Sequence, residues 1–212
     1  MSLLLSKISK HYGRKPVLEG VDAVFHKGLT LLVGPSGAGK STLLRVIATA
    51  EKPSSGEMGW KGAPLPAARI LLRRALGYAP QAVDLPDDLT GREFALHMAA
   101  LKGLDRATAD AQFSAITDAI NLFPDINQRI ATYSGGMRRR LVFAQALLGA
   151  PELIVLDEPT AELDSHTAAL LETLIVERSA HSCVVMTTHA SAQLTRHASA
   201  TLHVEGRKVF PI

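Results

Sequence analysis

The sequence has little of what disulfide-bonded, membrane-spanning or secreted proteins require. It contains one cysteine, Cys183, so no disulfide can form within the chain. Apolar runs stay far below the roughly 20 residues that cross a bilayer, and the longest, among them Leu153–Leu156 and Cys183–Met186, have strand length. The apolar stretch near the start, Leu3–Leu5, is too short for a signal peptide. These absences favour a soluble intracellular protein that reaches a membrane only through a partner.

Neither positive nor negative charge is in large excess. The 212 residues carry 23 Lys and Arg against 20 Asp and Glu, a net charge of +3, which gives no reason to expect a nucleic-acid partner. The densest basic run, Arg138–Arg140, is expected to be a solvated helix face. A hydrophobic fraction of 47% is ample for one large domain or a domain with an inserted subdomain. Cys183 lies in an apolar run and is expected to be a buried strand residue.

Strand-like and helix-like segments alternate along the chain. Strands are expected at Leu3–Leu5, Val21–Phe25, Leu29–Val33, Leu153–Leu156, Val184–Thr187, Thr201–Val204 and Lys208–Phe210, and turns between short strands at Glu51–Gly62. Helices are expected from Lys40 to about Thr49 and at Thr90–Leu101, Asp105–Leu122, Gly136–Leu148 and His166–Glu177, with a capping box formed by Thr90 and Glu93. This order predicts an α/β fold with a mainly parallel sheet and N-terminal antiparallel strands. We expect one domain, with a core at residues 1–81 and 150–212 and a helical subdomain inserted at about 82–149.

A glycine-rich loop follows the apolar run Leu29–Val33 and opens a helix. The loop fits the pattern glycine, any four residues, then Gly-Lys-Ser, which in this context is typical of P-loop nucleotide hydrolases. Glycines let backbone N–H groups point inward at phosphate oxygens, a lysine supplies a cation, and a serine hydroxyl can hold Mg²⁺. The alternative is a glycine-rich turn with no ligand. The predicted ATP-binding residues here are Gly34, Pro35, Ser36, Gly37, Ala38, Gly39, Lys40, Ser41 and Thr42.

Two carboxylates, Asp157 and Glu158, stand at the end of the predicted strand Leu153–Leu156. Ligands of open α/β sheets bind beyond such strand ends. Asp157 is therefore expected to hold Mg²⁺, and Glu158 to act as general base on the attacking water. Taken alone, the pair could equally be two exposed acids that begin a turn before Pro159.

A P-loop by itself fits a kinase, a GTPase or a helicase, and the segment Tyr133–Met137 narrows the choice. Tyr133-Ser-Gly-Gly-Met137 resembles the signature of ATP-binding cassette (ABC) ATPases, usually written Leu-Ser-Gly-Gly-Gln. The order of phosphate loop, glutamine, signature, acidic strand and histidine also resembles this family over nearly the whole chain. Tyr133 and Met137 depart from the usual signature, and Glu162 stands where a small residue is usual.

The resemblance implies roles for further residues. Tyr12 resembles the aromatic residue that stacks on adenine, and Gln81 the glutamine that contacts Mg²⁺. Ser134, Gly135 and Gly136 would contact ATP held by the other protomer, Asp164 ends a loop that crosses the dimer interface, and His189 would contact the γ-phosphate as a catalytic residue. Each has a plainer alternative: a half-buried ring for Tyr12, a loop residue for Gln81, a helix N-cap for Ser134 and a surface or capping residue for His189.

The resemblance implies an Mg²⁺-dependent ATPase subunit of a transporter, of export type. It would work as a homodimer, or as a heterodimer with a second ABC ATPase, and bind integral membrane subunits beside Ala82–Leu89 and Thr90–Lys102. It would be cytoplasmic and peripheral on the inner face of the cell membrane. Mg²⁺ would be held by Ser41, Gln81 and Asp157. Two alternatives are a soluble ABC ATPase acting on nucleic acid or ribosomes, which usually has two cassettes or a long coiled coil, and a binding module that hardly hydrolyses ATP, which the presence of Glu158 disfavours.

Overall fold

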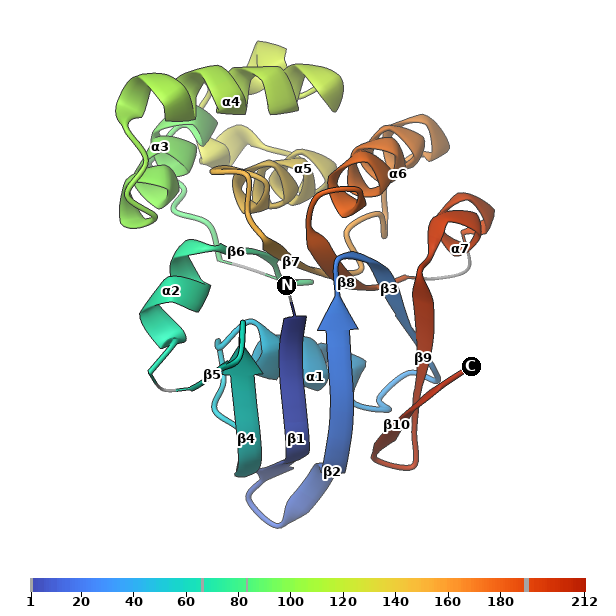
Figure 1. Cartoon of the computed structure of the whole chain (residues 1–212). Coiled ribbons are helices and arrows are strands. Elements are labelled where there is room, and N and C mark those ends of the chain that lie inside the picture. Colours follow the sequence, from blue (N-terminus) through green and yellow to red (C-terminus); the bar gives the residue numbers. More distant parts are fainter. Residues whose placement is uncertain (1, 66, 83, 189–190) are drawn as a thin grey trace.

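Two sheets with a helix between them form the lower part of the molecule (Figure 1). The computed structural model describes residues 2–65, 67–82, 84–188 and 191–212. The first sheet is antiparallel and has the order β2-β1-β4-β5. Its strands are β1 (Ser2–Tyr12), β2 (Lys15–His26), β4 (Ser55–Trp60) and β5 (Ala63–Pro64). The long hairpin of β1 and β2 ends at the turn that carries Gly13, which has a φ of 59°.

The second sheet has the order β10-β9-β3-β8-β7-β6, and all its neighbours pair in parallel except β10 with β9. Its strands are β3 (Gly28–Val33), β6 (Leu76–Ala79), β7 (Leu153–Asp157), β8 (Cys183–Thr187), β9 (Ala200–Glu205) and β10 (Lys208–Pro211). Cys183 is fully buried in β8, as predicted, and burial raises the pKa of its thiol to about 12. The predicted α/β fold with antiparallel N-terminal strands is confirmed.

Helices cover both faces of the parallel sheet. They are α1 (Lys40–Ile47), α2 (Arg69–Arg74), α3 (Gly91–Leu101), α4 (Arg106–Ala119), α5 (Gly135–Ala146), α6 (Ser165–Ser179) and α7 (Ala192–His197), with 3₁₀ turns η1 (Phe123–Asp125) and η2 (Ile130–Thr132). Helices α3, α4, α5 and α6 lie above the parallel sheet in Figure 1, and α1 lies below it, behind the antiparallel sheet. None of the helices in the described part of the chain is long and apolar enough to cross a membrane.

Alternating side chains of the parallel strands divide the core into two clusters. In β7, Leu153 and Val155 pack with α1 and the antiparallel sheet, whereas Ile154 and Leu156 pack with the helices on the other face. Successive residues of a strand point to opposite faces, so a fully apolar strand serves both clusters. The sheet therefore holds α1 on one side and α5 on the other.

Side-chain caps fix where the middle helices begin. Thr90 accepts a hydrogen bond from the Glu93 N–H at 3.1 Å, and the Glu93 carboxylate accepts one from the Thr90 N–H at 2.8 Å, which confirms the predicted capping box. Asp105 caps α4, and Ser134 caps α5 through the Met137 N–H. The cap alternative for Ser134 is thus confirmed, and its backbone begins α5 at the expected place.

Several predictions of secondary structure were incomplete. The segment Glu51–Gly62, expected to hold turns between short strands, contains β4, and the strands at the start extend well beyond the apolar runs. Helices α2 and α7 and strand β6 were not predicted. The prediction that Arg138–Arg140 is a solvated helix face was wrong, because each of the three guanidiniums donates to a backbone carbonyl of another segment or turn.

Candidate functional site

The loop between β3 and α1 curls through left-handed glycines. Gly34, Gly37 and Gly39 have φ angles of 140°, 76° and 106°. A side chain at Gly34 would overlap the Val204 carbonyl oxygen of β9, so this position requires glycine. Gly39 is the N-cap of α1 and has no side chain with which to cap it. The N–H groups of the first turn of α1 are therefore available to a bound anion.

Lys40 bends back over this loop. Its ammonium group donates to the carbonyl oxygens of Gly34 at 2.7 Å and Pro35 at 2.9 Å. These bonds keep a positive charge beside the inward-facing loop backbone. An anionic ligand in the loop would meet both the N–H groups and this ammonium group.

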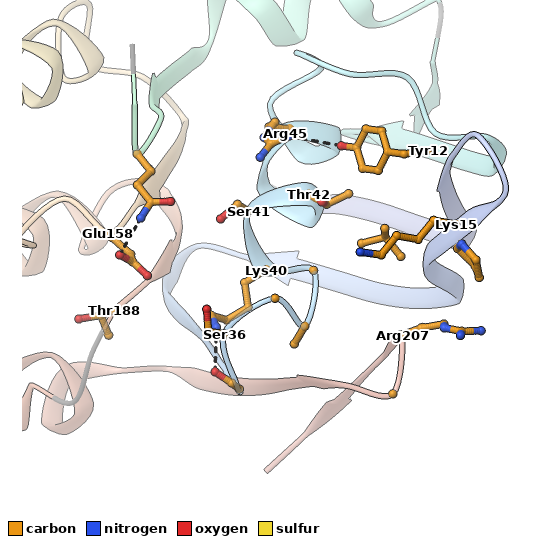
Figure 2. A pocket seen from close by; sticks show the side chains of 18 residues that line it. Tyr12, Lys15, Ser36, Lys40, Ser41, Thr42, Arg45, Glu158, Thr188 and Arg207 are labelled. Atoms are coloured by element: carbon orange, nitrogen blue, oxygen red, sulfur yellow. Dashed lines mark hydrogen bonds between the residues drawn. The ribbon is translucent and has the colours of Figure 1, made fainter.

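The loop forms one wall of a cleft of about 1120 Å³, large enough for a nucleotide. Its lining comprises Tyr12, Lys15, Pro16, Val17, Gly34, Ser36, Gly37, Ala38, Gly39, Lys40, Ser41, Thr42, Arg45, Gln81, Glu158, Thr188, Gly206 and Arg207. Figure 2 shows Glu158 and Thr188 on the side away from Tyr12, with Lys40 and Ser41 between them. The cleft therefore joins an aromatic ring, a phosphate-type loop and a carboxylate in that order.

The aromatic end is a fixed polar cluster. The Tyr12 hydroxyl donates to Glu51 at 2.7 Å, Arg45 lies 3.0 Å from the same carboxylate and 3.3 Å from the hydroxyl, and the Lys10 ammonium lies 5.1 Å from the ring centroid. Burial favours the neutral acid, but hydrogen bonds from Tyr12, Lys10 and Arg45 outweigh it and lower the pKa of Glu51 to about 2. The ionised carboxylate thus anchors a ring that is 42% exposed at the mouth of the cleft.

The acidic end is held by β8. Asp157 ends β7 and is buried, and its Oδ1 accepts the Thr187 hydroxyl at 2.7 Å. The Thr187 oxygen in turn accepts the Glu158 N–H at 2.9 Å. Gln81 donates its amide N–H to Glu158 Oε2 at 3.1 Å. Glu158 has a φ of 50°, an unusual backbone conformation for a residue with a side chain, and it points the carboxylate into the cleft.

The structure brings some of the predicted residues to the cleft and leaves others elsewhere. Tyr12, Gln81, Glu158 and most of the phosphate loop line it, and Pro35 contributes its carbonyl. Ser134, Gly135, Gly136 and Asp164 are not among its lining residues. Ser134 and Gly135 are exposed at the start of α5, and Asp164 caps α6 by accepting both the N–H and the hydroxyl of Thr167. The predicted catalytic His189 lies outside the described residues.

The predicted Mg²⁺ ligands offer a hydroxyl, an amide and a carboxylate oxygen. Ser41 and Gln81 line the main cleft, and Asp157 lines an adjoining hollow that shares Gln81 and Glu158 with it. Within the described residues there is no group of three or more His, Cys, Asp and Glu side chains that could hold a metal ion alone. Mg²⁺ prefers a few protein oxygens, with substrate phosphates and water as its remaining ligands. The predicted donor set therefore fits Mg²⁺.

Three basic residues of the cleft were missed by the sequence analysis. Lys15 lies at the β1–β2 turn, Arg45 on α1 and Arg207 in the β9–β10 turn. Arg207 is far from any motif in sequence, and only the fold brings it to the cleft. Together with Lys40 they make the cleft attractive to an anionic ligand.

Tyr133, which replaces the usual leucine of the signature, packs against a glycine of α3. The Tyr133 ring is buried, and its hydroxyl donates to the Asp125 carbonyl at 2.9 Å. A side chain at Gly91 would overlap this hydroxyl. A ring larger than leucine therefore fits before Ser134 because α3 begins with glycine.

Comparison with known proteins agrees with this geometry. Residues 18–161 match the family model described as ABC transporter. Nod factor export ATP-binding protein I of Rhizobium etli is 36% identical over 186 residues, 87% of this chain and 59% of that protein. The protein of the same name from Cupriavidus pinatubonensis is 33% identical over 88% of this chain and 58% of its own length. The chain thus spans a little under three fifths of these relatives.

Solved structures resemble the whole chain. One described as an ATP binding subunit of an ABC transporter has a TM-score of 0.89 at 26% identity and covers 99% of this chain, which in turn covers 88% of it. A dimeric ATP-binding cassette bound to ADP and Pi has a TM-score of 0.86 at 24% identity, over 98% and 96% of the two chains, and supports the fold. Because the family model covers most of the chain, from near the start of β2 past the acidic strand, the protein belongs to the ABC transporter family.

Proposed function

We propose that this chain is the ATP-binding and ATP-hydrolysing subunit of an ABC transporter. The observation that carries the proposal is the cleft in which a phosphate loop with Lys40 faces Glu158. Phosphoryl transfer to water requires positioning and charge neutralisation above all. This cleft offers both, because its loop and basic residues meet the phosphates and its carboxylate stands where water would attack.

Each end of the cleft has its own task. Tyr12 stacks on adenine, while the loop backbone and Lys40 hold the β- and γ-phosphates. Glu158 accepts a proton from the attacking water as general base, oriented by Gln81 and by the Thr187 hydroxyl on its N–H. Ser41, Gln81 and Asp157 would hold Mg²⁺, which when bound neutralises phosphate charge. We assign His189 to the γ-phosphate on the family resemblance alone.

A second protomer completes the site. None of Ser134, Gly135 and Gly136 lines the cleft of its own chain, although Gly135 lines the adjoining hollow, and Ser134 and Gly135 are exposed. In a head-to-tail dimer they would contact ATP bound by the partner, with Asp164 and the loop before it at the interface. The dimer is a homodimer or a heterodimer with a second ABC ATPase. Two copies of this chain would suffice, since one chain contributes every element that a site needs.

ATP-driven closure of this dimer would power transport through separate integral membrane subunits. The helical subdomain at about 82–149 would carry their docking site, at α3 and the segment before it. Relatives named for export of Nod factor favour an exporter. The chain would then be cytoplasmic and held on the inner face of the membrane by those subunits.

The change Glu158→Gln tests this proposal. It keeps size and shape but removes the charge that draws a proton from water. Because ground-state contacts come from the loop and Lys40, ATP affinity should survive. General-base catalysis contributes about 10²–10⁴-fold, so turnover should fall at least about 100-fold. ATP then remains bound, and a dimer should appear on size exclusion with ATP and Mg²⁺ but not with ADP.

The matched control is Glu177→Gln, the same chemical change at an exposed position of α6. It should leave turnover and dimerisation unaltered. Near-normal turnover in Glu158→Gln would refute the catalytic role of Glu158. Slow turnover with no ATP-dependent dimer would instead argue against the homodimer.

A further inference from the structure

We propose that Arg139 is a positioning residue that holds the turn bearing Glu158, and that it links the two ATP sites of the dimer. The inference rests on the function proposed above. Arg139 lies on α5, five residues after Ser134. Its neighbours Arg138 and Arg140 reach other segments, so the contacts of Arg139 are particular to it.

The Arg139 guanidinium donates hydrogen bonds to the backbone just after β7. One of its nitrogens donates to the Ala161 carbonyl at 2.7 Å and to the Glu158 carbonyl at 3.3 Å, and the other lies 3.3 Å from the Glu162 carboxylate. The Arg139 side chain is only 18% exposed, whereas that of Glu162 is 83% exposed. Exposed ion pairs contribute little, so the bonds to the two carbonyls are the important ones.

The turn that Arg139 holds has an unfavourable backbone. Glu158 has a φ of 50° and Glu162 a φ of 60°, in the left-handed region that residues with a Cβ avoid. Such conformations persist only when surrounding contacts enforce them. The Glu158 N–H is held by Thr187 and its carbonyl by Arg139, so the peptide groups on both sides of the carboxylate are fixed.

This placement connects two functions. The start of α5 carries Ser134 and Gly136, which under the proposed function contact the partner's ATP. Little more than one helical turn further on, Arg139 fixes the general base of its own site. When ATP binds to the partner or leaves it, α5 can be displaced only together with the turn that Arg139 holds. A movement of α5 would therefore reach the Glu158 turn directly, without a movement of the sheet.

Arginine suits this task better than lysine. Its planar group presents several donors in a fixed geometry, so one nitrogen meets both carbonyls while another faces Glu162, whereas a lysine ammonium is a single point charge on a flexible stem. The change Arg139→Lys therefore keeps the charge and loses the geometry. Arg139→Gln loses both the charge and the donor geometry, and the shorter glutamine side chain still fits the space.

The experiment measures kcat and KM for ATP, together with ADP affinity, on the purified chain with Mg²⁺. Misplacing a reacting group by about 1 Å can lower a rate about 100-fold, so Arg139→Gln should lower kcat by about 10- to 100-fold. ADP affinity and KM should change little, since the nucleotide contacts remain. Arg139→Lys should fall between wild type and Arg139→Gln.

Arg73→Gln is the matched control. Arg73 also donates to the carbonyl of a left-handed residue, Thr49, whose φ is 54°, but this lies beyond the far end of α1 from the phosphate loop. Its loss should leave kcat unaltered. An Arg139→Gln variant with unchanged kcat, or one that loses ADP affinity in parallel with kcat, would overturn the inference.

A double variant separates this inference from the proposed function. If Arg139 acts through Glu158, adding Arg139→Gln to Glu158→Gln should lower kcat little further, because the two residues act as a unit. If the two changes instead lowered kcat by independent factors that multiply in the double variant, the inference would be contradicted. Normal turnover in Glu158→Gln alone would sink the proposed role of Glu158. Stalled turnover in Glu158→Gln together with normal turnover in Arg139→Gln would refute only the role of Arg139.

Discussion

At the scale of single residues, the ring of Tyr12 owes its position to a carboxylate that is not part of the cleft lining. Glu51 accepts the Tyr12 hydroxyl, and Arg45 and Lys10 keep that carboxylate ionised. The ring is therefore presented at the cleft mouth before a nucleotide arrives. A fixed ring loses little freedom on stacking, which strengthens binding.

Tyr12→Ala should weaken ATP binding, because one aromatic–base stack is worth about 1–3 kcal/mol. Tyr12→Phe keeps the ring and loses the hydroxyl bonds to Glu51 and Arg45, so its affinity should fall only slightly below that of the wild type. Titration of each variant with ATP measures the difference. If Tyr12→Ala binds as tightly as the wild type, the ring is a structural residue.

The sequence revealed the residues of the site that belong to compact motifs. The phosphate loop and Glu158 were predicted because glycine spacing and an acidic strand end are local signals. Glu51 and Arg207 were not, because each reaches the site through tertiary pairing: β1 brings Glu51 its partners, and the β9–β10 turn brings Arg207. The contacts of Arg139 were missed for the same reason, since its carbonyl partners lie about 20 residues away along the chain.

At the scale of elements, the start of α3 depends on its capping box. Thr90→Ala removes the acceptor for the Glu93 N–H, which should lower the free energy of unfolding by about 1 kcal/mol. For a chain of this size that corresponds to about 2–4 °C in Tm. Thr173→Ala is the control, because that exposed hydroxyl donates to the Ala169 carbonyl of its own helix, α6, and accepts a long bond of 3.5 Å from Gln193 of α7. A thermal melt that shows equal losses for both variants would contradict the cap.

Helix length decides how much of the fold could be predicted. The long capped helices α3, α4, α5 and α6 have enough residues for their periodicity and caps to be recognised. The six-residue α2 and α7 are too short for either signal, and they form because tertiary packing fixes residues such as Leu72 and Leu194 in the core. The four-residue β6 lacks an alternating pattern, since three of its four residues are buried and the fourth is half-buried.

At the scale of the whole molecule, the side chain of Ser134 in the signature does not line the cleft of its own chain. Ser134→Arg should therefore leave ATP binding to the monomer intact and block ATP-induced dimers, since the new side chain would occupy the space of the partner's phosphates. Equilibrium binding and size exclusion measure the two effects. Thr90→Arg is the control for the loss of an N-cap, and it should still dimerise. Loss of monomer binding in Ser134→Arg would imply a role within its own cleft.

The contact between Gly91 and Tyr133 restricts the order in which descendants of this sequence can change. Any side chain at Gly91 would overlap the Tyr133 hydroxyl, which is held in place by the Asp125 carbonyl. Leucine at position 133 would remove that obstacle, so it must arise before, or together with, a larger residue at position 91. Lineages that keep the tyrosine are thus committed to the glycine. Related chains should vary at these two positions as a pair and not independently.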